Sequence, residues 1–260
     1  MTTSGEATRQ AHRGLEIAGR AGFGINAVQH VLIGLLALQI ARGVGGARAD
    51  QSGALGAVAA QPFGRTLLWL FVAGFAGLSL VHVARAVGIR GDDAKGDRFN
   101  AGALSVYYVA LAVLALQFAR GSGGGGQDVT ATALTWPGGR LLVGAVGLVF
   151  VGVGVYHCYK GVTSGFRDEL NIRDLMGRSG TAVERFTQFG YLAKGVALIL
   201  IGVLVVIGAV RFDPKSAGGL DTALHALASR PFGPYLLSLV ALGLIAFGGF
   251  LAVRARRGKV

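Results

Sequence analysis

The chain has 260 residues, of which 52% are hydrophobic and 15% charged, and its formal net charge is +12. Its 44 glycines argue against a water-soluble helical protein, because glycine is costly inside such helices. The basic residues cluster at the ends of apolar segments, which argues against a nucleic-acid partner. Attraction to anionic lipid at the membrane surface explains the positive charge more simply.

Six nearly uncharged windows follow one another along the chain. A run of about 18 or more such residues predicts a membrane-spanning helix. The physical reason is that lipid offers no partner for free backbone polar groups. The windows cover roughly residues 21–41, 66–84, 101–119, 141–159, 189–210 and 235–253.

The six windows form three copies of one two-helix unit. Residues 36–43, LALQIARG, match residues 114–121, LALQFARG, without a gap, and the third copy aligns through Gly202, which falls on Gly34. A repeat of about 75 to 90 residues is longer than a soluble solenoid unit but suits a membrane hairpin. Small residues recur at matching places and predict a helix contact face, made by Gly34, Ala37, Ala41, Ala112, Ala115, Ala119, Gly202 and Ala209.

The distribution of Lys and Arg predicts the orientation. Most of them lie in the N-tail, in the loops after the second and fourth spans, and in the C-tail, which places both termini in the cytoplasm. Two spans per copy return the chain to the same side, so the copies share one orientation and are related by an axis along the membrane normal. We predict an all-α, polytopic membrane protein with six transmembrane helices in three tandem hairpins and a pseudo-threefold arrangement.

The predicted segments follow from the windows. They are a cytoplasmic N-tail (1–16), hairpins at 17–90, 98–161 and 184–255, a cytoplasmic linker (162–183) and a basic C-tail (256–260). The loops inside the hairpins carry short apolar segments, such as 54–58 and 220–227, before Pro62, Pro137 and Pro231. About ten residues are too few to cross the membrane. We expect short interfacial helices that cover the bundle; a gate over a central cavity is the alternative.

Polar residues inside the spans are the candidates for function, because they are expensive there. Asn26, Gln29 and His30 share one face of the first span. Tyr108 is the repeat mate of His30, and Lys194 is the mate of Asn26. We predict a ligand-binding cluster from these five residues. For His30 the alternatives are a structural hydrogen bond and a proton relay, and Lys194 either snorkels to the cytoplasm or meets an anion.

Two histidines of the second spans form a separate candidate site. His82 aligns with His157, and a basic residue follows three positions later in all three copies as Arg85, Lys160 and Arg254. Equivalent histidines in a pseudo-symmetric bundle could face each other and ligate a haem iron or a chlorin magnesium. The alternatives are interfacial histidines without a ligand and a ligand-lined cavity. The three basic residues are expected at lipid headgroups.

The pattern Arg20-Ala21-Gly22-Phe23 before the first span, with Gly53-Ala54-Leu55 and Gln61-Pro62-Phe63-Gly64-Arg65 before the second, resembles the DUF1206 family. The middle copy departs from it with Trp136-Pro137-Gly138-Gly139. The resemblance covers about residues 17 to 255. It implies a bacterial integral membrane protein with three two-helix repeats and no established function, and it adds no catalytic residue.

Enzymatic function finds little support in the sequence. The spans contain no paired carboxylates, and the chain has no HExxH, GxSxG or Walker motif. We expect a non-enzymatic binding, accessory or scaffold subunit of the inner membrane, with the bilayer and other membrane subunits or a second copy as partners. The alternatives are a carrier or channel for a small or lipidic molecule through an inner-half polar cavity, and tetrapyrrole binding through His82 and His157.

Overall fold

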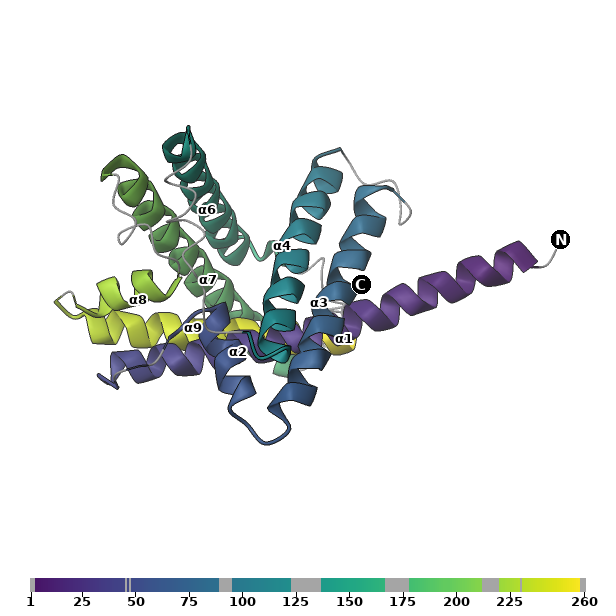
Figure 1. Cartoon of the computed structure of the whole chain (residues 1–260), viewed down its shortest axis with the longest axis horizontal. Coiled ribbons are helices and arrows are strands. Elements are labelled where there is room, and N and C mark those ends of the chain that lie inside the picture. The colour runs from purple at the N-terminus through teal and green to yellow at the C-terminus, as the bar shows by residue number, and fades with distance from the viewer. Residues whose placement is uncertain are drawn as a thin grey trace.

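The computed structural model describes residues 3–44, 46, 48–88, 95–122, 137–166, 178–211, 220–229 and 231–257. Within these ranges all regular structure is helical (Figure 1). The helices are α1 (Thr3–Ala41), α2 (Gln51–Ala59), α3 (Gly64–Ala86), α4 (Lys95–Ala119), α6 (Gly139–Val162), α7 (Arg178–Arg211), α8 (Leu220–Ala228) and α9 (Gly233–Arg257).

Six of the helices contain a segment long and apolar enough to cross a membrane. These segments are Arg13–Ala41, Gly64–Ala86, Asn100–Ala119, Gly139–Val162, Val183–Arg211 and Gly233–Arg256. The predicted all-α fold with six spans is therefore confirmed, and the chain is a multi-pass membrane protein.

The ends of two spans differ from the predicted segments. The N-tail is continuous with the first span, because α1 already begins at Thr3 and projects from the body of the protein (Figure 1). α7 likewise begins at Arg178, inside the expected linker. Residues 167–177 of that linker, the end of the C-tail and the middle copy's outward segment, residues 123–136, lie outside the described residues.

The outward loops of the first and third copies form the short helices α2 and α8, as predicted. Asp50 caps α2, because its carboxylate accepts a hydrogen bond of 2.7 Å from the Gly53 backbone N–H. A second carboxylate, that of Asp221 at the start of α8, accepts a bond of 2.9 Å from the Ala49 backbone N–H. The outward loops of copies one and three are therefore tied to each other.

Each second span starts from the same turn. The residue after the proline has a left-handed backbone in all three copies, with φ of 61° at Phe63, 59° at Phe232 and 75° at Gly138. The next residue is glycine; at Gly64 a Cβ would lie only 2.6 Å from the Ala59 carbonyl oxygen. The middle copy keeps this turn although it lacks the phenylalanine.

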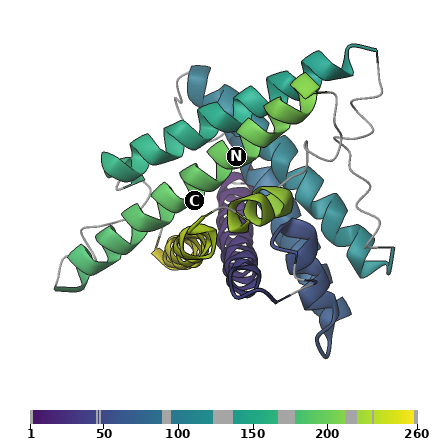
Figure 2. The same ribbon diagram turned by 90° about the vertical axis from the view of Figure 1, so that its left-hand side faces the viewer.

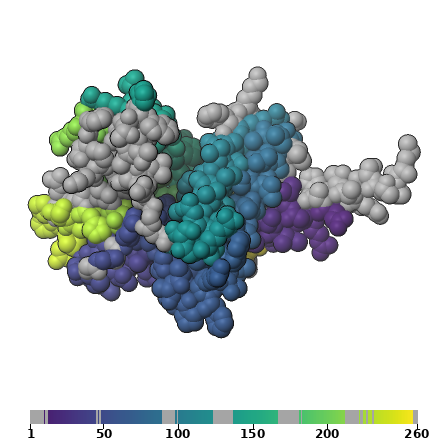
Figure 3. All heavy atoms as spheres, in the orientation of Figure 1, coloured from purple at the N-terminus to yellow at the C-terminus, as the bar shows by residue number. Residues whose placement is uncertain are grey.

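The closest helix pairs join different copies: α3 with α4, α6 with α7, and α9 with α1. In each pair the second span of one copy packs against the first span of the next, and the last span closes on the first. Figures 1 and 2 show the three pairs crossing one another steeply, and Figure 3 shows α3 and α4 lying side by side. The pseudo-threefold relation therefore links three inter-copy pairs.

The three pairs use equivalent positions where they approach most closely. A Cβ on Gly154 of α6 would lie 2.7 Å from the Gly195 carbonyl oxygen of α7. In α3 the equivalent residue is Ser79, whose hydroxyl donates to a backbone carbonyl of α4 at 3.2 Å. A glycine therefore lets the two helices approach closely in two of the pairs. In the third pair, α3–α4, a serine hydrogen bond stands in place of the glycine contact. The equivalent contacts are Gly154–Gly195, Gly248–Ala27 and Ser79–Ser105.

The predicted stripe of small residues is a helix contact face. A Cβ on Gly34 would lie 2.8 Å from the Ala241 carbonyl oxygen of α9, and one on Gly202 would lie 2.6 Å from the Gly147 carbonyl oxygen of α6. The alanines of the stripe are buried or half-buried. Gly34 and Gly202 of the stripe therefore lie in the α1–α9 and α6–α7 contacts.

The two spans of a copy also touch in copies one and three, but hardly in the middle copy. A Cβ on Gly74 of α3 would lie 2.9 Å from the Ile25 Cβ of α1, and Gly243 packs on Ala193 in the same way. The middle copy has Val149 at this position, and its side chain is 64% exposed. Only 28% of the α4 span and 17% of the α6 span are buried, against 44–56% of the others. The middle hairpin is therefore splayed, with α4 and α6 apart (Figure 1).

Candidate functional site

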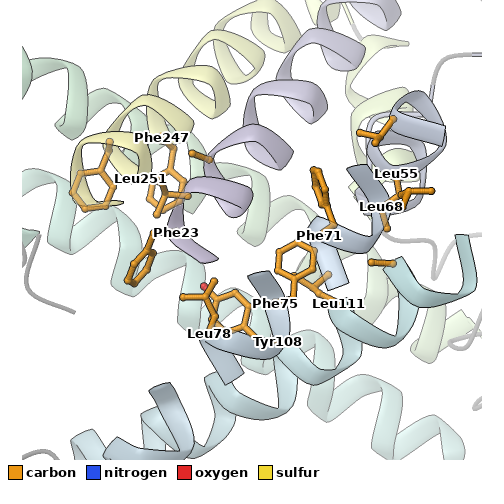
Figure 4. Packing of buried hydrophobic residues seen from close by; sticks show 14 of the residues in the cluster. Phe23, Leu55, Leu68, Phe71, Phe75, Leu78, Tyr108, Leu111, Phe247 and Leu251 are labelled. Atoms are coloured by element: carbon orange, nitrogen blue, oxygen red, sulfur yellow. The ribbon is translucent and has the colours of Figure 1, made fainter. Parts of the chain in front are cut away.

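A buried hydrogen bond joins α1 to α4 inside the bundle. The Asn26 side-chain amide donates to the Tyr108 hydroxyl at 3.1 Å. The Tyr108 ring stacks on His82 of α3 with a centroid separation of 5.4 Å, and on Phe75 at 6.4 Å. Figure 4 shows Tyr108 beside Phe75 within the aromatic core. Together with Gln29, one turn further along α1, these polar residues form what we call the Asn26 cluster (Asn26, Gln29, His82 and Tyr108).

The Asn26 cluster contains polar atoms that are buried without a hydrogen-bond partner among the described residues. They are the Asn26 Oδ1, both amide atoms of Gln29 and the His82 Nδ1. Gln29 is only 1% exposed. Each buried and unsatisfied polar group costs about 1–3 kcal/mol. The cluster is therefore short of partners that a bound molecule or ordered water would supply.

A second group of polar side chains surrounds Phe247 of α9. The His30 ring lies 5.1 Å from the Phe247 ring, and the Lys194 Nζ lies 4.0 Å from its centroid. His157 of α6 and Tyr191 of α7 complete the group, at 6.5 Å and 5.2 Å from Phe247. Lys194 and His157 both lie within electrostatic range of His30. We call His30, His157, Tyr191, Lys194 and Phe247 the Phe247 cluster.

The five predicted ligand-binding residues fall into these two clusters. The structure brings Asn26 and Tyr108 into contact, and it brings His30 and Lys194 to two sides of one phenylalanine. His30 Nδ1 is also 2.9 Å from the Asn26 carbonyl oxygen, one turn back on α1. The Lys194 ammonium lies over Phe247, so the cation is held by an aromatic face.

The basic residues near the ends of the second spans also lie over aromatic rings. The Arg254 guanidinium is 4.3 Å from the Phe23 centroid, and the Lys160 Nζ is 5.6 Å from the Tyr191 centroid. Tyr191 occupies in copy three the position of Phe23 in copy one, so the two contacts are equivalent. Arg85 lies close to His82. Headgroup binding by these cations stays a prediction.

The two histidines proposed as a metal pair have separate surroundings. His82 stacks on Tyr108, whereas His157 stacks on Tyr191 at 5.8 Å and bonds to the Val153 carbonyl oxygen. No group of three or more His, Cys, Asp or Glu side chains is placed to hold a metal ion in the described parts of the chain. Tetrapyrrole ligation by the pair stays a prediction, and it would need both rings to leave their tyrosines.

Sequence reasoning missed Phe247 and Tyr191, the aromatic residues that organise the second cluster. Tyr191 lies one turn before Lys194, so the helical spacing of these two residues could have placed them on the same face of the span. Phe247 has no such signal, because its mates in the other copies are Leu78 and Val153.

Comparison with known proteins identifies the family. The family model described as Domain of Unknown Function (DUF1206) matches three times, at residues 21–88, 100–164 and 189–258. The chain is 30% identical over 248 residues to a protein of Bacillus subtilis (strain 168) named uncharacterized protein YxxB. That match covers 91% of this chain and 88% of the relative. No solved structure matches. The chain belongs to the DUF1206 family, and the three matches fit the three tandem hairpins.

Proposed function

We propose that this DUF1206 protein is a non-enzymatic binding protein of the bacterial plasma membrane, with both termini in the cytoplasm, and that the Asn26 cluster holds a small amphipathic ligand. The observation that carries the proposal is Gln29, which is 1% exposed with both amide atoms unpartnered among the described residues. In a bilayer no bulk water reaches such a group, so a bound molecule or trapped water has to supply the missing partners, and we assign that role to a ligand.

The surroundings of the cluster support an amphipathic ligand. The Asn26 Oδ1 has no partner among the described residues, and the Tyr108 ring, whose hydroxyl accepts from the Asn26 amide, continues into an apolar wall of Phe75 and Phe71. Ligand sites commonly combine a few polar groups with such an apolar lining. The described spans carry carboxylates only near the starts of the spanning segments of α1 and α7, which supports binding over acid–base catalysis.

The test is a comparison of small molecules that co-purify with the protein from its native membrane, by mass spectrometry, for wild type, Gln29→Leu and Gln39→Leu. Gln39 is an exposed glutamine on the same helix and serves as the matched control. We expect one molecule to be depleted about tenfold or more in Gln29→Leu, since a lost polar contact of 1.4 kcal/mol costs tenfold in affinity. Gln39→Leu should retain it.

The thermal stability of Gln29→Leu separates lost binding from lost folding. Replacing an unsatisfied buried amide with an apolar side chain should leave the ligand-free protein as stable as wild type, or more so. Identical small molecules on wild type and Gln29→Leu would contradict the proposal. Polypeptides that co-purify instead would favour the accessory-subunit alternative, and an absorbance band lost in both His82→Leu and His157→Leu would favour a tetrapyrrole.

A further inference from the structure

We infer that the headgroup of the ligand is an uncharged carboxamide, bound by the side chains of Gln29 and Asn26 inside the hydrocarbon region. The inference rests on the proposed binding function and names the chemical class of its ligand. Three observations carry it: the hydrogen-bonding atoms that lack a partner, the depth of these atoms in the bilayer, and the way in which α1 and α4 meet at the Asn26 cluster.

The atoms without a partner define the group that would complement them. Among the described residues, Gln29 lacks partners for its Nε2 and its Oε1, and Asn26 lacks one for its Oδ1. The Gln29 amide can therefore donate one hydrogen bond and accept another side by side, and the Asn26 Oδ1 can accept a third. The two residues are three positions apart on α1, so their side chains are neighbours on the helix surface. A primary carboxamide matches all three atoms, because its carbonyl accepts from Gln29 and its two N–H groups donate to Gln29 and Asn26.

The bond to Tyr108 makes Asn26 an acceptor for the ligand. The Asn26 Nδ2 donates to the Tyr108 hydroxyl at 3.1 Å, so the Oδ1 is the amide atom left for a bound molecule. The Tyr108 ring stacks on Phe75, and Phe75 meets Phe71 edge to face at 5.8 Å. The ligand therefore has to offer hydrogen-bond donors to the two amides and an apolar chain to the aromatic rings.

The depth of Gln29 in the membrane favours an uncharged headgroup. Arg20 is the last charged residue before the apolar part of α1, and Gln29 follows nine residues later, about 14 Å along the helix. The hydrocarbon core is about 30 Å thick, so Gln29 lies near its middle. An ionised group is expensive at this depth, whereas a carboxamide is neutral at every pH. Arg85 and Arg254 lie within electrostatic range of His82, so an anionic ligand is the alternative that the experiment has to separate.

The helices that carry Asn26 and Tyr108 are joined by side chains alone. The backbones of α1 and α4 hardly approach each other in the described ranges, so the Asn26–Tyr108 bond links two helices that are not packed closely on one another. Only 28% of the α4 span is buried, which places much of it against lipid. A ligand can therefore enter between α1 and α4 by displacing side chains, without breaking a close main-chain contact.

The test measures the binding of three probes to delipidated full-length protein in mild detergent by native mass spectrometry. Hexadecanamide carries the proposed headgroup. Methyl hexadecanoate keeps the carbonyl and the chain but has no N–H group, and hexadecanoic acid at pH 8 supplies a carboxylate. We expect hexadecanamide to bind about tenfold more tightly than either of the others, because both lack the N–H donors. Equal binding of the amide and the ester would overturn the inference, and so would tighter binding of the acid, which would indicate an anionic ligand.

Gln29→Met assigns the preference to the Gln29 amide, because it keeps the length of the side chain and removes both hydrogen-bonding atoms. It should lower the binding of hexadecanamide to that of the ester and leave the ester unchanged. Gln39→Met makes the same change at an exposed position of α1 and should bind all three probes as wild type does. A preference for the amide that survives Gln29→Met would refute the assignment.

The failure of this inference can be told apart from the failure of the proposed function. If Gln29→Leu loses its co-purified molecule while wild type binds the three probes alike, the proposed function stands and the carboxamide headgroup is wrong. If wild type and Gln29→Leu carry the same molecules and wild type does not prefer the amide, both proposals fail, and trapped water is then the partner of Gln29.

Discussion

Substituting alanine for Gly154 tests the contact on which the inter-copy pairs depend. The new Cβ would lie 2.7 Å from the Gly195 carbonyl oxygen and 2.8 Å from the Ile199 backbone nitrogen. Both are main-chain atoms, so no rotamer change relieves the contact, and α6 must move away from α7. Such overpacking costs about 1–3 kcal/mol. Replacing a helical glycine with alanine stabilises the helix by about 0.5–1 kcal/mol. The middle values of the two ranges leave a net loss of about 1 kcal/mol.

The control is Gly152→Ala, two residues away on the same helix. A Cβ there meets no atom within 4 Å, so only the gain from removing a glycine remains. Thermal unfolding of both variants in one detergent, at one heating rate, measures the difference. At about 2–4 °C per kcal/mol, Gly154→Ala should melt about 2–4 °C below wild type and Gly152→Ala slightly above it. The proposed α6–α7 contact is refuted if Gly154→Ala melts at or above the wild-type temperature.

Two further predictions concern other contacts of the bundle. In a variant without the native cysteine, a cysteine pair at Ile25 and Gly74 should form a disulfide on mild oxidation, whereas a pair at Ala103 and Val149 should not. The Cβ positions at Ile25 and Gly74 are 2.9 Å apart, so the helices need to separate by only about 0.6–1 Å to reach the 3.5–4.5 Å of a disulfide. Equal cross-linking on gels would show that the middle hairpin is closed. Asp221→Ala should lower stability by about 1–2 kcal/mol through the lost bond to the outward loop of copy one, and unchanged melting would show that this bond does not hold the loops together.

The spans, the repeat and the two outward helices were predictable because they follow from local patterns. Apolar length, matching small residues and the proline before each second span are all properties of contiguous sequence. The contact between Asn26 and Tyr108 could also have been predicted from the sequence, because a polar group inside a span needs a partner and few polar partners are available.

The pairing of the helices could not be predicted in the same way. Glycines lie on the faces that pack within a copy, such as Gly74, and on the faces that pack between copies, such as Gly154. Sequence alone does not rank these contacts. For the same reason His82 and His157 looked like a pair: a rotation places equivalent residues in different interfaces, and they meet only at the axis itself.

The pairing of α9 with α1 means that the first span to be synthesised has to wait for the last span before it can pack against its partner. The first span leaves the ribosome early, while the helix that covers its Ala27 and Gly34 face is made last. Until then the nascent protein holds α1 in lipid, with the His30 side chain lacking its Phe247 neighbour. A chain truncated before α9 is therefore expected to be less stable in the membrane than the full chain. The packed parts of the first and last spans begin and end beside each other, as the bond from Arg20 to the Arg256 carbonyl oxygen shows, whereas the earlier turns of α1 project from the body (Figure 1). A circularly permuted gene that leaves out the projecting turns should therefore encode the same bundle.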